Sequence, residues 1–270
     1  MITGASSGFG AAAAHAFGAE GSKLLLGARR VDRLEEVALA ARQAGAPAAH
    51  FHALDVSKTS SVEAFVAWAR ETINDHQSPI TIRQPPITRP PSSSARLDVL
   101  INNAGGAQGL DTVAEGKDED WETMLQVNVL GILRMTRAAL PLMLDNPGSS
   151  LINIGSLAGH VAYEGGAAYC AAKAGELQIT RALRLELNGT GIRVTTVDPG
   201  LAETEFSVVR FKGDVARANK VYEGTRPLTA EDIADILVWV ASRPPHVNID
   251  ELVVKPVDQA AIHKIYRRKV

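Results

Sequence analysis

The residues best suited to chemistry in this sequence are a tyrosine and a lysine four positions apart. Tyr169 and Lys173 lie in a helical segment, where this spacing puts both side chains on one face. A phenol has an ordinary pKa of about 10, so a tyrosine that acts as a base near neutral pH needs it lowered by roughly 2–3 units. A close ammonium such as that of Lys173 would lower it, together with any further positive charge in the site. The pair predicts a general acid/base, although such pairs on helices are more often structural.

Two polar residues upstream complete a candidate catalytic set. Ser156 follows the strand-like run Ser150–Ile154, and a hydroxyl there would hold a substrate oxygen on which charge develops. Asn128 lies between two valines in a helix-like stretch. We predict a buried amide that binds backbone and water and connects Lys173 to solvent. An ordinary amide on the helix surface is equally compatible with the sequence.

A glycine-rich turn at the start of the chain predicts a phosphate-binding site. The segment TGASSGFG leads into an alanine-rich helix over Ala11–Phe17. Glycines let the backbone approach a pyrophosphate, and the N-terminus of the helix offers free N–H groups and a positive dipole end. Taken alone this spacing is weak, because glycine-rich loops are common. The expected contacts are Gly4, Ser6, Ser7, Gly8, Phe9 and Gly10.

Two arginines about twenty residues after the turn indicate which dinucleotide would bind. Arg29 and Arg30 end the second strand-like run, where a fold that prefers NAD usually places an acid for the ribose 2′-hydroxyl. Guanidinium groups suit a phosphate dianion better than a neutral diol. We therefore predict NADP as the cofactor. For one of the two arginines, a solvated position at the start of a helix is an alternative.

Small or polar residues also end the third and fourth strand-like runs. Asp55 and Val56 follow one run, and Asn103, Ala104 and Gly105 follow the next. Ligands of open parallel sheets bind beyond the carboxyl ends of the strands, so these residues are expected to contact the cofactor. Asp55 alone would also serve as a helix cap, and the Asn-Asn-Ala-Gly segment alone would form a turn.

These residues need a scaffold, and the apolar runs of the chain predict one. Short apolar runs alternate with stretches of helical periodicity, such as Val31–Ala44 before Gly45 and the longer stretch Trp121–Leu144. This alternation favours a parallel sheet covered on both faces. We predict an α/β fold, a doubly wound parallel sheet of the Rossmann type, as a single domain over residues 1–270. The strand-like runs are Lys23–Leu26, Ala48–Leu54, Leu97–Ile101, Ser150–Ile154, Ile192–Val197 and Leu252–Val257.

Two features depart from this pattern. The first strand is truncated: only Met1–Thr3 precede the glycines, whereas about five or six residues are usual, and we expect its loss to misplace the turn. Residues 73–96 hold five of the thirteen prolines and no helical period, which predicts a Pro/Ser-rich insertion that is disordered at the surface. Together these features lead us to expect a chain with a late start and retained extra sequence. A divergent form is the alternative.

Composition excludes several other classes of protein. Apolar residues make up 46% and charged residues 21%, and a net charge of −2 gives no reason to expect nucleic acid. The single cysteine, Cys170, allows no intrachain disulfide and has no histidine or acid placed to activate it. The histidines show no metal-ligand spacing, so no metal is expected. No apolar run approaches the about 18 residues of a membrane helix, so we expect no membrane partner.

In combination, these motifs resemble those of the short-chain dehydrogenase/reductase family. The ordered set is T-G-x-x-x-G-x-G, N-N-A-G, an asparagine, a serine, Y-x-x-x-K and Pro199-Gly200. The resemblance implies a catalytic tetrad with Tyr169 as general acid/base and Ser156 orienting the substrate carbonyl. It further implies that Lys173 binds the nicotinamide ribose and Asn128 supports a proton-relay water. It adds Tyr169, Pro199, Gly200 and Thr204 to the expected cofactor contacts.

The C-terminal third is similar to a subgroup of that family, the NADP-dependent 3-hydroxy acid dehydrogenases, which also oxidise serine and L-allo-threonine. This resemblance rests on residues 199–214 and 243–249 and implies a cytoplasmic homotetramer. Such a substrate needs a partner for its carboxylate, and we expect the segment just after Pro199-Gly200, which holds Arg210, to fold over the site as a covering segment. We expect Arg210 beside Ser156 and Tyr169 in the substrate site; an exposed basic face is the alternative. A broad-specificity NADPH-dependent carbonyl reductase and a non-catalytic nucleotide-binding relative are the competing functions.

Overall fold

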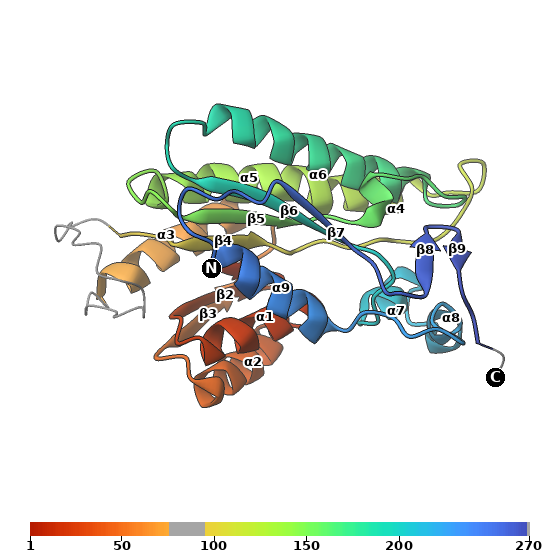
Figure 1. The fold of residues 1–270 in the computed structure, drawn as a ribbon, viewed down its shortest axis with the longest axis horizontal. Helices are drawn as coiled ribbons and strands as arrows, with labels where there is room; N and C mark the ends of the chain where they lie inside the picture. Colours follow the sequence, from red (N-terminus) through yellow and green to blue (C-terminus); the bar gives the residue numbers. More distant parts are fainter. Residues whose placement is uncertain (76–94, 269–270) are drawn as a thin grey trace.

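The computed structural model describes residues 1–75 and 95–268. At its centre lies one sheet of seven strands, all parallel, in the order β3-β2-β1-β4-β5-β6-β7 (Figure 1). The predicted α/β fold with a doubly wound parallel sheet is confirmed. The strands are β1 (Ile2–Thr3), β2 (Leu24–Ala28), β3 (Ala49–Ala53), β4 (Val99–Asn102), β5 (Ser150–Ile154), β6 (Arg193–Pro199) and β7 (Glu251–Val254).

Helices cover both faces of the sheet, as near-continuous apolar strands require. One apolar cluster joins a sheet face to α1 (Gly8–Ala19), α2 (Val31–Ala44) and α9 (Ala230–Ala241). The other includes residues of α3 (Thr59–Asp75), α5 (Gly131–Ala139) and α6 (Ala167–Glu186). Helix α2 has the predicted bounds, because Gly45 ends it at a φ of 132°, in a region that favours glycine. Figure 1 shows these two helical layers on opposite sides of the sheet.

The predicted helical stretch Trp121–Leu144 is continuous but not uniform. It consists of α4 (Asp118–Leu125), a π-helical turn η1 (Gln126–Leu130), α5 and the 3₁₀ turn η2 (Leu140–Leu142). Such π turns occur often at functional sites. Here the turn carries Asn128, one of the predicted catalytic residues.

The first strand is short, as predicted, but it does not misplace the glycine turn. Ile2 and Thr3 pair with β2, and Ile2 also pairs with β4 on the other side. The Met1 carbonyl accepts a bond from Ile101 N, and the Ala5 amide donates to the Gly27 carbonyl. Pairing on both sides therefore holds the turn at the carboxyl end of β1, and this part of our expectation was wrong.

The predicted insertion at residues 73–96 lies largely outside the described residues. Its first residues, 73–75, belong to α3, contrary to the prediction that helical structure stops before them. At the other end Ala95 is buried, and Leu97 packs in the same apolar cluster. Both ends of the stretch are thus part of the ordered domain.

Elements near the C-terminus gather beyond the carboxyl ends of the strands. They are α7 (Phe206–Arg210), α8 (Val215–Lys220) and the antiparallel pair β8 (Gln259–Ala261) and β9 (Lys264–Ile265), which Figure 1 shows together at one end of the molecule. The sequence analysis did not predict α8, β8 or β9. It did place a covering segment just after Pro199-Gly200, and α7 occupies that position.

Candidate active site

A cavity of about 790 Å³ opens at the carboxyl ends of the strands. This volume lies in the usual range for small-molecule sites, and the position is the one at which open α/β sheets bind ligands. Most of the predicted site residues line it: Gly4, Ser6, Ser7, Gly8, Phe9, Arg29, Arg30, Asp55, Val56, Asn103, Ala104, Gly105, Ser156, Tyr169, Lys173, Pro199, Gly200, Thr204 and Arg210. Gly10 and Asn128 do not belong to the lining.

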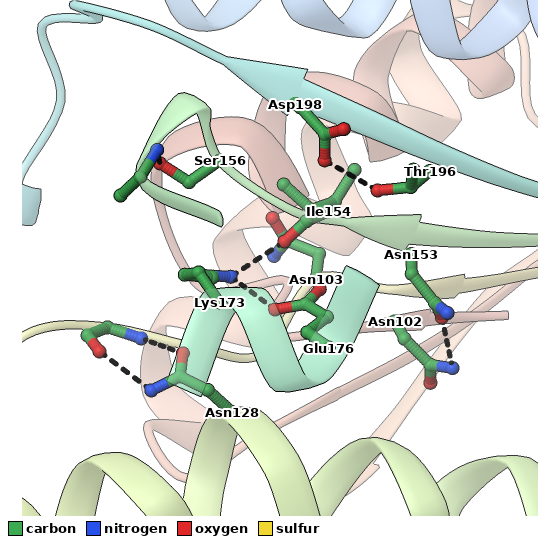
Figure 2. A network of polar contacts seen from close by, with 12 residues as sticks. Asn102, Asn103, Asn128, Asn153, Ile154, Ser156, Lys173, Glu176, Thr196 and Asp198 are labelled. Carbon is green, nitrogen blue, oxygen red and sulfur yellow. Dashed lines mark hydrogen bonds and ion pairs between the residues drawn. The ribbon is translucent and has the colours of Figure 1, made fainter. Parts of the chain in front are cut away.

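Tyr169 and Lys173 enter the cavity from the first half of α6. Both are nearly buried, and the Tyr169 ring lies 5.7 Å from that of Phe206 on α7. The Lys173 ammonium donates to the Ile154 carbonyl at 2.8 Å and to the Glu176 carboxylate at 2.7 Å (Figure 2). An ammonium has three hydrogens to donate, so these bonds leave one for another acceptor.

Glu176 follows Lys173 by three residues on the same helix, and its side chain is fully buried. Burial raises the pKa of Glu176 to about 7, against the opposing effect of Lys173. Burial also disfavours the charge of Lys173, but the negative charge and hydrogen bond of Glu176, together with the nearby Tyr169 and Asp198, outweigh it and raise the pKa of the lysine. Near neutral pH Lys173 therefore keeps its charge, and Glu176 is the member that gains or loses a proton.

Ser156 begins the 3₁₀ turn η3 (Leu157–Gly159) directly after β5. Its side-chain oxygen accepts a bond from the Ala158 amide at 3.1 Å, which orients the hydroxyl. The hydroxyl hydrogen remains available to donate to a ligand oxygen. Ser156 thus meets the geometric requirement for holding a polarised oxygen in the cavity.

Asn128 lies beneath the cavity and is 1% exposed, so the alternative of a surface amide is wrong. Its side chain donates to the carbonyls of Gly106 and Met124 and accepts from the Gly106 amide. A Cβ on Gly105 would lie 2.7 Å from Asn128 Oδ1 and 3.6 Å from Lys173 Nζ. Asn128 therefore fixes the loop after β4 close to the lysine, as Figure 2 shows from the side.

The glycine turn is held by polar contacts from the end of β4. The Asn103 side chain donates to the carbonyls of Thr3 and Gly4, and the Thr3 hydroxyl accepts from the Asn103 amide. Gly10 packs behind the turn: a Cβ there would lie 2.5 Å from the Gly4 carbonyl oxygen. Gly10 thus permits close packing of α1 on the turn, although it does not line the cavity.

The two predicted arginines are exposed at the far end of the cavity. Arg30 donates to the Ser6 and Ser7 hydroxyls and to the Glu205 carboxylate, which Arg33 also binds. Burial opposes the ionisation of Glu205, but hydrogen bonds from these two arginines outweigh it and lower its pKa. The sequence analysis missed Arg33 and Glu205. Arg29 and Arg30 nevertheless line the cavity beside the turn, where an anion would meet both.

Asp55 lines the cavity, and its carboxylate stabilises a turn ahead of α3 instead of capping that helix, which begins at Thr59. The carboxylate accepts from the Ser57 amide and hydroxyl at the start of the loop before α3. Burial opposes its ionisation, but the bonds from Ser57 outweigh it and lower its pKa. A fixed carboxylate at this strand end can accept hydrogen bonds from hydroxyl or amino groups of a ligand.

Arg210 reaches into the cavity and is not part of an exposed basic face, so that alternative is wrong. Its guanidinium lies over the rings of Tyr163 and Tyr169, 5.4 and 5.7 Å from their centroids. The Nε group donates to the Gly109 carbonyl, which anchors α7 to the loop after β4. Tyr163, which the sequence analysis missed, stays a neutral phenol because burial raises its pKa to about 12, against a lowering by Arg210.

Glu176 and Glu205 had weak signals in the sequence. Glu176 stands one helical turn after Lys173, at a spacing that brings opposite charges together. Glu205 follows the predicted contact Thr204, but its approach to Arg30 depends on how the covering segment folds.

Within residues 1–75 and 95–268, no three His, Cys, Asp or Glu side chains are grouped to hold a metal ion. None of the helices described there is long and apolar enough to cross a membrane.

Comparison with known proteins gives consistent matches over nearly the whole chain. The family model for short chain dehydrogenases matches residues 1–76 and 91–214. The chain is similar to a sulfoacetaldehyde reductase from Chromohalobacter salexigens, at 42% identity over 261 residues that cover 96% of this chain and 94% of the relative. It is also similar to an NADP-dependent 3-hydroxy acid dehydrogenase from Schizosaccharomyces pombe, at 39% identity over 270 residues, 100% of this chain and 96% of the relative.

Among solved structures, the chain resembles the closed form of serine dehydrogenase complexed with NADP⁺. The TM-score is 0.83 at 37% identity, and the match covers 99% of this chain and 98% of the other. The similarity to both dehydrogenases agrees with the subgroup expected from the sequence. The sulfonate-bearing substrate named for the reductase was not anticipated.

Proposed function

The chain belongs to the short-chain dehydrogenase family, and we propose that it is an NADP-dependent oxidoreductase for short hydroxy acids. It would transfer a hydride between the cofactor and the hydroxyl-bearing carbon of serine, L-allo-threonine or a 3-hydroxy acid. The observation that carries this proposal is that Ser156, Tyr169 and Lys173 line one cavity together with the glycine turn.

The residues present fit a dinucleotide phosphate. A Cβ on Gly4 would lie 2.9 Å from Ala104 Cα, so the turn and the end of β4 approach as closely as glycine allows. Arg30 binds the Glu205 carboxylate, and this contact supports a role for its guanidinium in binding an anion. The glycine turn would hold the pyrophosphate, Arg29 and Arg30 the 2′-phosphate, and Lys173 the nicotinamide ribose. When bound, oxidised NADP supplies the acceptor for the hydride.

The residues of the site would divide the proton chemistry among them. Ser156 would donate to the substrate oxygen and hold it near Tyr169. During oxidation the phenolate of Tyr169 would take the hydroxyl proton as the C–H bond loses its hydride, so that the alcohol becomes a carbonyl. The Lys173 ammonium would favour that phenolate, and Asn128 would support a water that returns the proton to solvent.

An anionic group on the substrate would be complementary in charge to Arg210, which lines the cavity. Arg210 lies over the Tyr169 ring, close to where the reacting hydroxyl would be held. Carboxylates and sulfonates both accept bonds from a guanidinium. The sulfoacetaldehyde reductase from Chromohalobacter salexigens acts on a sulfonate by its name, so short sulfonate-bearing aldehydes and alcohols belong to the same candidate class.

Replacing Arg210 by alanine should raise KM for an anionic substrate by about 10–100-fold, the effect of losing one charge-assisted hydrogen bond. KM for an uncharged alcohol of the same length should change by less than about threefold. Steady-state kinetics with both substrates measure the difference. An equal change in both values would show that Arg210 does not recognise the anion.

Two other functions remain distinguishable by experiment. A broad-specificity carbonyl reductase would have the same fold and the same proton chemistry, and would differ in the shape of its pocket. A non-catalytic nucleotide-binding relative has lost its main support, because the short first strand leaves the glycine turn in place. Two assays followed by the absorbance of NADPH separate them: purified protein with NADP and L-serine, and purified protein with NADPH and a neutral ketone. Turnover of hydroxy acids supports our proposal, whereas turnover of neutral ketones alone supports the carbonyl reductase.

A cytoplasmic homotetramer stays a prediction. Exposed apolar side chains on three helices of one face, Leu125 on α4, Leu133 on α5 and Leu185 on α6, are available for contacts between copies of the chain. Burial of such side chains is a common driving force for association.

A further inference from the structure

A buried carboxylate contacts the candidate catalytic lysine, and none of the roles above uses it. The Y-x-x-x-K spacing ends at Lys173, and Glu176 lies one helical turn further along α6. It is 0% exposed, and its Oε2 accepts from Lys173 Nζ at 2.7 Å. Its other oxygen, Oε1, is buried and has no hydrogen-bond partner among the described residues.

Such an arrangement is costly for the fold. Removing two charges from water is unfavourable, and an apolar residue of similar size would often leave the fold as stable. The unpartnered Oε1 adds to that cost, because a buried acceptor without a donor loses its bonds to water. A buried ion pair placed beside a reactive group is therefore better explained by its effect on that group than by stability.

Glu176 constrains where the ammonium lies. Lys173 has a flexible stem of four carbons, and its Nζ is fixed by two acceptors on different elements, the Ile154 carbonyl on β5 and Glu176 on α6. Figure 2 shows the ammonium between them. These two bonds fix the direction of the third ammonium hydrogen. They also reduce the number of conformations open to the lysine side chain.

Glu176 also changes the electrostatic environment of the Tyr169 phenol. The positive Lys173 favours the phenolate, whereas a negative charge next to the lysine opposes that effect. The other titratable group that acts on Glu176 is Asp198 on β6, which itself binds the Thr196 hydroxyl and His160. From η1, the Asn128 side chain is neutral, so it adds no charge. The Tyr169 site is thus faced by two cations, Lys173 and the Arg210 guanidinium 5.7 Å from the ring centroid, and by two buried acids, Glu176 and Asp198.

We propose that Glu176 is a positioning residue that holds the Lys173 ammonium at the end of β5 and moderates its charge on Tyr169. The pH at which Tyr169 works as a base then depends on Glu176 as well as on the tyrosine itself and on the cations Lys173 and Arg210. This inference rests on the proposed function for its kinetic consequence. The geometry of the ion pair stands independently of it.

Glu176→Gln tests the proposal, because it removes the negative charge and keeps the shape. With the lysine charge no longer opposed, kcat/KM for alcohol oxidation should reach half its maximum about 1 pH unit lower than in the wild type. The sign follows from the raised pKa of Glu176: above about pH 7 the wild-type residue is ionised and opposes phenolate formation, an effect that glutamine lacks. If kcat/KM of Glu176→Gln reached half its maximum at the same pH as in the wild type, the proposal would be overturned.

Two further variants separate charge from shape. Glu176→Asp keeps the charge but shortens the side chain, so it should keep the wild-type midpoint within about 0.3 unit even if kcat falls. Glu251→Gln is the matched control, because Glu251 also pairs with a cation of α6, Arg181, at a distance from Tyr169. In Glu251→Gln, kcat/KM should reach half its maximum at the same pH as in the wild type. A loss of rate in all Glu176 variants without a shift for glutamine would indicate a structural role alone.

A second readout does not depend on turnover. Tyrosinate absorbs in the ultraviolet at longer wavelength than tyrosine, and subtracting the titration of Tyr169→Phe from that of the full protein isolates the Tyr169 signal. The midpoint of this signal should also be lower in the Glu176→Gln background. If the wild type turns over no alcohol but this shift is present, the proposed function fails and the role of Glu176 stands. If the wild type is active and neither midpoint moves, the role of Glu176 fails alone.

Discussion

Replacing Tyr169 by phenylalanine is expected to lower kcat for hydroxy acid oxidation by about 10²–10⁴-fold, the usual contribution of a positioned general base. The substitution removes the phenol oxygen and keeps the ring, so the contact with Phe206 and the packing of α6 should persist. Affinity for NADPH should change by less than about tenfold, because the residues proposed to hold the phosphates and adenosine line other parts of the cavity. Steady-state rates and a fluorescence titration with NADPH measure the two effects.

Tyr163→Phe is the matched control, since it removes the same atom from the same cavity. Burial keeps the pKa of Tyr163 at about 12, too high for a base near neutral pH. Its loss should lower kcat by less than about tenfold, through its contact with Arg210. If Tyr163→Phe reduced kcat more than Tyr169→Phe did, the assignment of the base would have to move to Tyr163.

The double variant Arg29→Ala/Arg30→Ala is expected to reduce the preference for NADP over NAD by about 10²-fold or more. Charge-assisted hydrogen bonds contribute about 1.5–3 kcal/mol each, and two guanidinium groups would lose theirs to the 2′-phosphate. The ratio of kcat/KM values for the two cofactors measures the change. Activity with NAD should change much less, because its ribose carries a neutral hydroxyl at this position.

Arg33→Ala provides the control for loss of positive charge. Arg33 binds Glu205 as Arg30 does, but it does not line the cavity. Its removal should change the cofactor ratio by less than about threefold, as expected for an exposed ion pair. An unchanged ratio in the double variant would mean that the 2′-phosphate assignment is wrong.

The sequence was most informative where one local rule decides the structure. Helix α2 has its predicted bounds, since its apolar face is regular and Gly45 supplies the left-handed residue that ends it. Strand β5 also has its predicted bounds, Ser150–Ile154, whereas β7 ends at Val254, three residues before the predicted end. Val257 extends the strand-like pattern there but lies fully exposed in a turn.

The effect of the short first strand was not predictable from local sequence. Its hydrogen bonds go to β2 and β4, which are distant in sequence, and the side chain of Asn103 supports the turn from about a hundred residues away. The burial of Asn128 was equally hard to predict. It lies in a π-helical turn, and no residue pattern in the sequence indicated such a turn. Tertiary contacts, not propensity, decided both features.

The predicted site residues came together because strand ends in a parallel sheet meet at one edge. The charges that surround them were harder to foresee. Glu205 reaches Arg30 only because α7 lies over the cavity, and Asp198 binds His160 across the ends of β6 and η3. A pattern of residue types locates a site, but its ion pairs depend on how covering segments fold.

The central claim is that this cavity transfers a hydride between an alcohol carbon and NADP with Tyr169 as the base. The direct test incubates the protein and NADP with L-serine, a 3-hydroxy acid or 2-hydroxyethanesulfonate, each deuterated at the hydroxyl-bearing carbon. We predict that mass spectrometry finds deuterium in the reduced cofactor for at least one substrate, at a rate that collapses in Tyr169→Phe. Cofactor that binds but gains no deuterium from any of them, or an undiminished rate in Tyr169→Phe, would contradict the claim.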